Sequence, residues 1–275
     1  MSDVTKVYHY CSPQSFKAII ETKSLWLTNT STMNDTMEGI WYKNILIEEL
    51  EKNIIKGKNE QLINNLYNTV VHNLTNKFIC CFSEYGDILS QWRAYADDGR
   101  GFAVGFSVEK TQILQKIPSW MAVNDSKHSI GIAPVIYDRE RQKELIANQV
   151  SDIISKNSNL PPEKTTLLSQ YSTIFKNPAF SEEKEWRIIH TPLITYDKNY
   201  SFSVIGKISD CNFRLSKFGV SPYFTWNFKE LDPLPIEEII LGPQNTTPPE
   251  DLLFFLSHNG YQNITIKFSA ASYRS

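Results

Sequence analysis

Short β-prone runs and amphipathic helical stretches follow each other along this chain without a regular β–α–β period. A parallel sheet needs a crossover, usually a helix, between neighbouring strands, whereas antiparallel strands need only short turns. The irregular order therefore predicts an α+β fold with flanking helices and a mostly antiparallel sheet, either continuous or split. The runs expected as strands are 4–10, 25–28, 77–84, 102–107, 130–138, 183–191, two or three within 201–228, 236–243 and 264–269.

Helices are expected where capping signals precede apolar residues at helical spacing. Ser12 and Pro13 open the first one, because serine accepts hydrogen bonds from free N–H groups and proline suits the first turn. The polar-rich segment 38–74 predicts two helices separated near Gly57. We interpret it as a helical insertion in a single domain spanning residues 1–275. The other expected helices are 87–98 with Asp87 as cap, 108–117 with Ser107 as cap, 139–156, 161–176 and 249–258.

Composition excludes several classes of protein. The 275 residues carry 28 Lys and Arg against 30 Asp and Glu, a net charge of −2, which argues against binding nucleic acid through bulk positive charge. No apolar run reaches the roughly 18 residues that a membrane helix needs, and the first residues lack an apolar signal core. The four cysteines show no CxxC spacing, and the five histidines are scattered. We therefore expect a cytoplasmic protein with reduced thiols, no metal and no membrane partner.

The segment Glu183-Lys184-Glu185-Trp186-Arg187 is the most informative candidate site. On a strand, residues 183, 185 and 187 would point to one face, bringing two carboxylates and a guanidinium together. Such a face can accept a proton and stabilise a developing positive charge. A solvated ladder of ion pairs on an edge strand is the alternative, and it stays open.

Three further segments suit ligand binding as well as ordinary structure. His9, between Tyr8 and Tyr10, can bind a ligand hydroxyl close to a helix start, or can be a structural histidine. Trp92, Arg93 and Tyr95 can stack on a planar ring, or can pack beneath a turn. Thr28 and Asn34 border a segment that is either a ligand loop or a turn. These candidates are His9, Tyr10, Thr28, Asn34, Trp92, Arg93 and Tyr95.

Common catalytic motifs are absent. The chain has no phosphate-binding GxxxxGK[ST] loop, no GxGxxG between a strand and a helix, no GxSxG elbow and no HExxH. Cys80 and Cys81 lie in an apolar strand with no histidine adjacent in sequence, so we interpret them as core residues and not as nucleophiles.

An ordered set of motifs resembles a bacterial family known as domain of unknown function 2971. The motifs are YHYCS (8–12), LWLTNTSTMND (25–35), FICCFSEYGDILSQWRAYADDGRGFAVGF (78–106), EKEWR (183–187), EEIILGP (237–243) and KFSAASYR (267–274). This resemblance spans nearly the whole chain but implies no particular activity.

The order of motifs also resembles the ADP-ribosyltransferases. These enzymes begin with a strand bearing His or Arg, continue with a helix and a strand–loop, and end with a strand carrying a catalytic Glu, often as Glu-x-Glu. Glu185 and Glu183 match the last motif, His9 the first, and Thr28 poorly matches the middle one. The helical segment 38–74 departs from a compact version of that fold.

This second resemblance implies an ADP-ribosyltransferase-like fold and an enzyme that cleaves the nicotinamide–ribose bond of NAD. It implies that Glu185 stabilises the cationic ribose, that Glu183 positions or deprotonates an acceptor, and that His9 binds the ribose or diphosphate. Arg187 would pair with Glu183 or reach a phosphate. The residues implied to bind NAD are His9, Tyr10, Thr28, Asn34, Trp92, Arg93, Tyr95 and Arg187.

Beyond the active site, the resemblance implies a bacterial toxin or anti-phage defence effector with a protein or nucleic-acid acceptor. A non-catalytic module that binds a nucleotide or a protein is the alternative, and a different enzyme class, such as a nuclease, also stays open. The enzyme hypothesis requires His9 and Glu185 to line one cleft.

Overall fold

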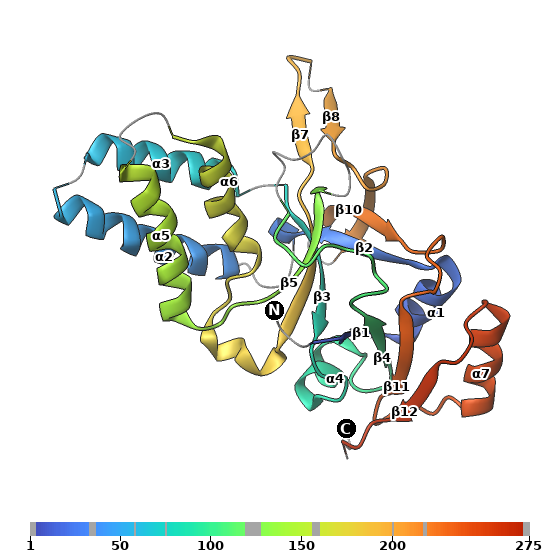
Figure 1. The fold of residues 1–275 in the computed structure, drawn as a ribbon. Coiled ribbons are helices and arrows are strands. Elements are labelled where there is room, and N and C mark those ends of the chain that lie inside the picture. Colours follow the sequence, from blue (N-terminus) through green and yellow to red (C-terminus); the bar gives the residue numbers. More distant parts are fainter. Residues whose placement is uncertain are drawn as a thin grey trace.

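The computed structural model describes residues 4–32, 37–57, 59–74, 76–118, 128–155, 160–199, 201–216 and 219–271. It has an α+β architecture in which a large sheet lies beside a cluster of helices (Figure 1). The strands are β1 (Lys6–Cys11), β2 (Ser24–Asn29), β3 (Phe78–Ser83), β4 (Phe102–Ser107), β5 (Ile130–Pro134), β6 (Glu185–His190), β7 (Leu193–Tyr196), β8 (Phe202–Ile205), β9 (Asn212–Ser216), β10 (Gly219–Asn227), β11 (Ile236–Leu241) and β12 (Thr265–Phe268). The helices are α1 (Pro13–Thr22), α2 (Met37–Ile55), α3 (Glu60–His72), α4 (Leu89–Tyr95), α5 (Arg139–Ser155), α6 (Pro162–Gln170) and α7 (Pro249–His258).

The main sheet is mostly antiparallel, as the irregular order of elements predicted. Its strands follow the order β12-β11-β4-β1-β3-β2-β10-β9. Off this path, β6 pairs with both β3 and β5. Among the strand pairs that the structure describes, β11 with β12 is the parallel one, because α7 connects them as a crossover. The strands β7 and β8 form a separate hairpin that projects from the body in Figure 1.

The sheet divides at β3. One edge of β3 pairs with β6 over its whole length. Its other edge pairs with β1 only at Tyr8–Ser83 and with β2 only at Thr28–Ile79 and Asn29–Phe78. The strands β1 and β2 therefore separate along this edge, and residues 80–82 of β3 have no strand partner there. We call this opening the fork.

Two hydrophobic cores lie on opposite faces of β3, because alternate side chains of a strand point in opposite directions. Phe78, Cys80 and Phe82 belong to the core beneath α1 and α7. Ile79 belongs to the core formed with α2, α3, α5 and α6. The helical cluster thus covers one face of the β3–β6–β5 portion of the sheet (Figure 1). None of the helices in the described part of the chain is long and apolar enough to cross a membrane.

Most local signals produced the expected elements. The Ser12 hydroxyl accepts a hydrogen bond from the Ser15 N–H and caps α1. Gly57, at φ +72°, lies between α2 and α3 in the segment predicted to contain two helices. Asp87, however, does not cap α4; its carboxylate accepts a hydrogen bond from the Trp92 indole instead.

Several predicted elements differ from the structure. The helix predicted over 161–176 ends at Gln170, and the strand predicted over 130–138 ends at Pro134. Residues 108–117 form turns and not a helix, because the Leu114 carbonyl bonds to Ile132 in β5 and to Lys116 within the turn. The strand predicted from residue 183 begins only at Glu185, because 178–183 form a 3₁₀ helix that ends at Lys184 in the left-handed conformation (φ 45°).

Candidate active site at the fork

A cavity of about 1080 Å³ opens at the fork. Its walls come from β1, β2 and the unpaired edge of β3, together with side chains of α1, α2, α3, α4, β6, β7, β9 and the 3₁₀ helix before β6. The divergence of β1 from β2 creates the space, because no strand occupies the edge of residues 80–82. We call this space the fork cavity.

His9 bridges the open edge of β3. Its Nδ1–H donates to the Cys81 carbonyl oxygen at 2.9 Å, and its ring contacts Phe82 at 5.6 Å between centroids. Burial lowers the pKa of His9, so the ring is neutral at pH 7 despite the opposing effect of the Cys81 hydrogen bond. Because a carbonyl oxygen only accepts, the proton is on Nδ1 and Nε2 carries a lone pair. Nε2 is thus a hydrogen-bond acceptor on a residue of the cavity wall.

Four charged side chains form an ion-pair cluster, Lys176, Glu183, Glu185 and Arg187. Arg187 donates twice to Glu185, from Nε to Oε1 at 2.8 Å and from its terminal nitrogen to Oε2 at 2.9 Å. Lys176 donates to Glu185 at 3.0 Å and to Glu183 at 2.5 Å. The side chain of Glu185 is only 6% exposed, so these interactions are well shielded from solvent.

The two carboxylates differ in acidity. Burial alone would raise the pKa of Glu185, but the charge and hydrogen bonds of Arg187, with Lys176 and the Cys81 thiol, lower it to about 2. Burial raises the pKa of Glu183, and its hydrogen bond to Lys176 compensates only in part. Glu185 is therefore held ionised, and Glu183 is the better proton acceptor.

The predicted alignment of residues 183, 185 and 187 on one strand face is wrong for Glu183, which lies in the 3₁₀ helix. Glu183 still reaches the same place, because Lys176 contacts both carboxylates. The alternative of a solvated ladder does not fit Glu185 and Arg187, which are buried.

His9 and Glu185 both line the fork cavity, from opposite sides of β3. Cys81 connects them: its carbonyl binds His9, and its thiol hydrogen-bonds to Glu185. The His9 ring instead lies beside Phe82 and 3.8 Å from the Cys80 sulfur, on the other face of the strand. A ligand that touches both His9 and Glu185 must therefore lie in the fork itself.

Three of the remaining predicted residues line the fork cavity, and the two others that the structure describes do not. Tyr10, Thr28 and the half-exposed Tyr95 line the cavity with the residues above. Trp92 is fully buried against Tyr10 and outside the cavity lining, so the structure gives it a packing role in place of the predicted stacking role. Arg93 is exposed and also outside the lining, and Asn34 falls outside the described residues.

Sequence reasoning missed most of the other lining residues, among them the chemically functional Lys43, Cys81, Lys176 and Arg214. Lys43, Lys176 and Arg214 belong to no motif, and only chain folding brings them to the fork. Cys81 lies in the motif at 78–106 but was interpreted as a core residue, whereas the structure places it in the cavity wall. The charged side chains of the cavity lining are Lys43, Lys176, Arg187 and Arg214 against Glu183 and Glu185, a net charge of +2 over the described residues. This local excess contrasts with −2 for the whole chain and favours an anionic ligand.

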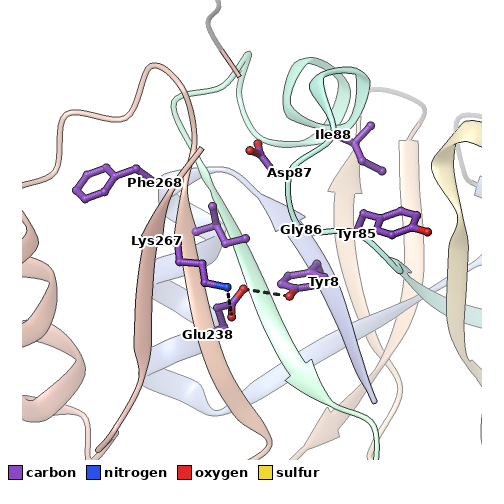
Figure 2. Close-up of a pocket in the computed structure, with 9 residues that line it drawn as sticks. Tyr8, Tyr85, Gly86, Asp87, Ile88, Glu238, Lys267 and Phe268 are labelled. Carbon is purple, nitrogen blue, oxygen red and sulfur yellow. Dashed lines mark hydrogen bonds and ion pairs between the residues drawn. The ribbon is translucent and has the colours of Figure 1, made fainter. Parts of the chain in front are cut away.

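A second, smaller cavity of about 500 Å³ contains another buried carboxylate, Glu238 (Figure 2). Tyr8 donates to it at 3.0 Å, Lys6 at 3.2 Å and Lys267 at 3.0 Å. Glu238 thus resembles Glu185 in burial and cation contacts but lies outside the fork cavity, which makes it a matched control. The described residues contain no group of three or more His, Cys, Asp or Glu placed to hold a metal ion.

A family model described as "Protein of unknown function (DUF2971)" matches residues 91–188. The predicted resemblance to DUF2971 is confirmed over this stretch. The DUF2971 segment runs from α4 through β6, so it contains Tyr95 and all four members of the ion-pair cluster. No curated protein and no solved structure matches the chain.

Proposed function

We propose that this protein is an ADP-ribosyltransferase-like enzyme that cleaves the nicotinamide–ribose bond of NAD in the fork cavity. The observation that carries the proposal is Glu185, a buried carboxylate with a pKa of about 2 in the wall of a large cavity. An ionised carboxylate stabilises a cationic sugar, and the net positive lining suits a diphosphate. The cavity volume of about 1080 Å³ is large enough for a dinucleotide.

In the first step, the bond between the ribose and the nicotinamide nitrogen breaks. The electron pair leaves with nicotinamide, which becomes neutral, and the ribose acquires oxocarbenium-like positive charge. Glu185 is already ionised at neutral pH, so it stabilises that charge without first losing a proton. Arg187 and Lys176 fix its orientation but oppose its charge, so the sugar has to lie closer to the carboxylate than to either cation.

In the second step, water or an acceptor group adds to the ribose carbon and loses a proton. Glu183 takes this proton, because burial raises its pKa and makes it the stronger base of the pair. The lone pair on Nε2 of His9 accepts a hydrogen bond from a ribose hydroxyl. Tyr95, half-exposed in the cavity wall, stacks on a ring of the ligand.

The experiment measures nicotinamide release after incubation of the purified protein with NAD. We expect release by the wild type and a loss of about 100-fold or more in Glu185→Gln, the scale seen when one electrostatic stabiliser is removed. Glu238→Gln is the matched control, since it neutralises another buried carboxylate and should keep activity near the wild-type level. Circular dichroism and thermal unfolding check that each variant is folded.

Glu185→Gln leaves Arg187 and Lys176 without their partner and can lower stability, so Glu183→Gln provides a second variant. Its side chain is 15% exposed, and we expect it to fold and to release nicotinamide more slowly. Absence of release by the wild type, or equal release by folded Glu185→Gln, would overturn the proposal. Binding of NAD without release would favour the binding-module alternative.

A further inference from the structure

Arg187 is not free to bind a phosphate. Its guanidinium is 1% exposed and already donates three hydrogen bonds. Nε and Nη2 donate to Glu185, and Nη1 donates to the Thr173 carbonyl oxygen. Lys176 is similarly engaged by two carboxylates. The charge excess of the fork cavity therefore comes from its other two cations, Lys43 and Arg214, neither of which has an acidic partner among the described residues.

Arg214 differs from Lys43 because part of its charged group is already dehydrated. Its Nε is buried and has no hydrogen-bond partner within the described part of the chain. A buried donor without a partner costs free energy, and an arginine in a cavity wall recovers this cost when a ligand supplies the acceptor. Arg214 lies on β9, whose partner β10 pairs with β2, so this wall is held by strand pairing and not by a free loop.

The charge of Arg214 also reaches the fork. It lowers the pKa of Cys80, although burial is the larger influence and raises that pKa to about 12 overall. Cys80 lies 3.8 Å from His9 Nδ1, and both residues line the same cavity as Arg214. The planar guanidinium group of arginine can donate hydrogen bonds to two phosphate oxygens at once.

We infer that Arg214 is the phosphate-binding residue of the fork cavity and selects ligands that carry a diphosphate next to the ribose. The inference rests on the proposed function for the identity of the ligand, and it assigns to β9 the phosphate contact that sequence reasoning offered to Arg187. Arg214 binds and positions the ligand, whereas Glu185 acts on the ribose.

Isothermal titration calorimetry with three probes tests this assignment: ADP-ribose, inorganic pyrophosphate and adenosine, which has no phosphate. Wild-type protein should bind ADP-ribose more tightly than adenosine. Arg214→Gln should weaken ADP-ribose and pyrophosphate binding on the order of 10- to 100-fold, the range of one charge-assisted bidentate contact, and leave adenosine binding unchanged. Arg214→Lys should fall between these values, because it keeps the charge and loses the paired donors.

Arg141→Gln is the control, because it removes the same charge at an exposed site on α5 that pairs with Glu144. It should bind all three probes as the wild type does. Equal ADP-ribose binding by Arg214→Gln and wild type overturns the inference, as does a wild type that binds neither anionic probe. If ADP-ribose binding depends on Arg214 but the wild type releases no nicotinamide, the proposed activity is wrong and the phosphate site is supported. If the wild type releases nicotinamide but Arg214→Gln binds ADP-ribose unchanged, the activity is supported and the phosphate site is wrong.

Discussion

The stability of this protein should fall in mild acid because of His190, a buried histidine on the strand that carries Glu185. Its side chain is 0% exposed and lies between aromatic rings, with Phe224 at 4.9 Å and Phe78 at 6.3 Å between centroids. Nδ1 donates to the Ser129 carbonyl at 3.1 Å, and Nε2 is buried without a partner among the described residues. Burial therefore lowers the pKa of His190 to about 4, although the Ser129 bond opposes the shift.

The sign of the effect follows from comparing the folded and unfolded states. Unfolded His190 takes up a proton near pH 6.5, but the folded protein resists protonation until about pH 4. The contribution of neutral His190 to the free energy of unfolding is therefore fully present above pH 6.5. It is lost as the pH falls toward 4, and the total loss is about 3.4 kcal/mol. Between pH 7 and pH 5 the loss from this residue should be about 2 kcal/mol.

Urea unfolding at pH 7 and pH 5 measures this loss. His190→Asn keeps a donor for the Ser129 carbonyl but cannot titrate. Between pH 7 and pH 5 its free energy of unfolding should therefore fall by about 2 kcal/mol less than that of the wild type, whatever its absolute stability. The exposed His258, replaced in His258→Asn, is the control and should leave the wild-type loss unchanged. His9 contributes in the same direction in all three proteins, so the difference isolates His190. Equal losses in the wild type and His190→Asn would refute the reasoning.

Two further predictions concern thiol reactivity and packing. Cys211 should react first with a disulfide reagent at pH 8, and Cys211→Ser should abolish the fast phase. Burial raises the pKa of all four thiols, but Cys11 and Cys80 are fully buried and the Cys81 thiol also hydrogen-bonds to Glu185, whereas Cys211 is only partly buried. A fast phase that survives in Cys211→Ser would disprove this. Gly101→Ala should lower the free energy of unfolding by about 3 kcal/mol or more, since its Cβ would lie 2.0 Å from the Cys11 carbonyl oxygen. Gly39→Ala, with open space around the new carbon, should change it by under about 1 kcal/mol in the same denaturation assay.

Local signals explain why much of the secondary structure was predictable. The Ser12 cap acts on an N–H only three residues away, so the start of α1 could be read directly from the chain. The same kind of signal misled at Ser107: its hydroxyl does accept from the Lys110 N–H, but no helix follows. A hydrogen bond from the Ile132 N–H in β5 to the Leu114 carbonyl takes the place of a helical one there, and a local pattern gives no indication of such a distant partner.

The candidate site was likewise predictable where it depends on neighbouring residues and not where it depends on distant ones. Glu185 and Arg187 are two residues apart on one strand, and the alternation of side chains along a strand is enough to place them on the same face. Lys176 and Arg214 were missed because a lone cation has no pattern of its own.

The sequence by itself determined the α+β class, most strand and helix starts, and the placement of Glu185 and Arg187 on one strand face, since each depends on residues a few positions apart. It did not determine their pairing, because Arg187 was expected to pair with Glu183 or to reach a phosphate and binds Glu185 instead. Only the tertiary structure decided that β1 and β2 separate along β3 and that His9 meets Cys81 across 72 positions. It also decided that a cavity with excess positive charge opens in a chain of net negative charge. The physical reason is that strand pairing and burial join distant segments, and the free energy of those contacts depends on the complete fold.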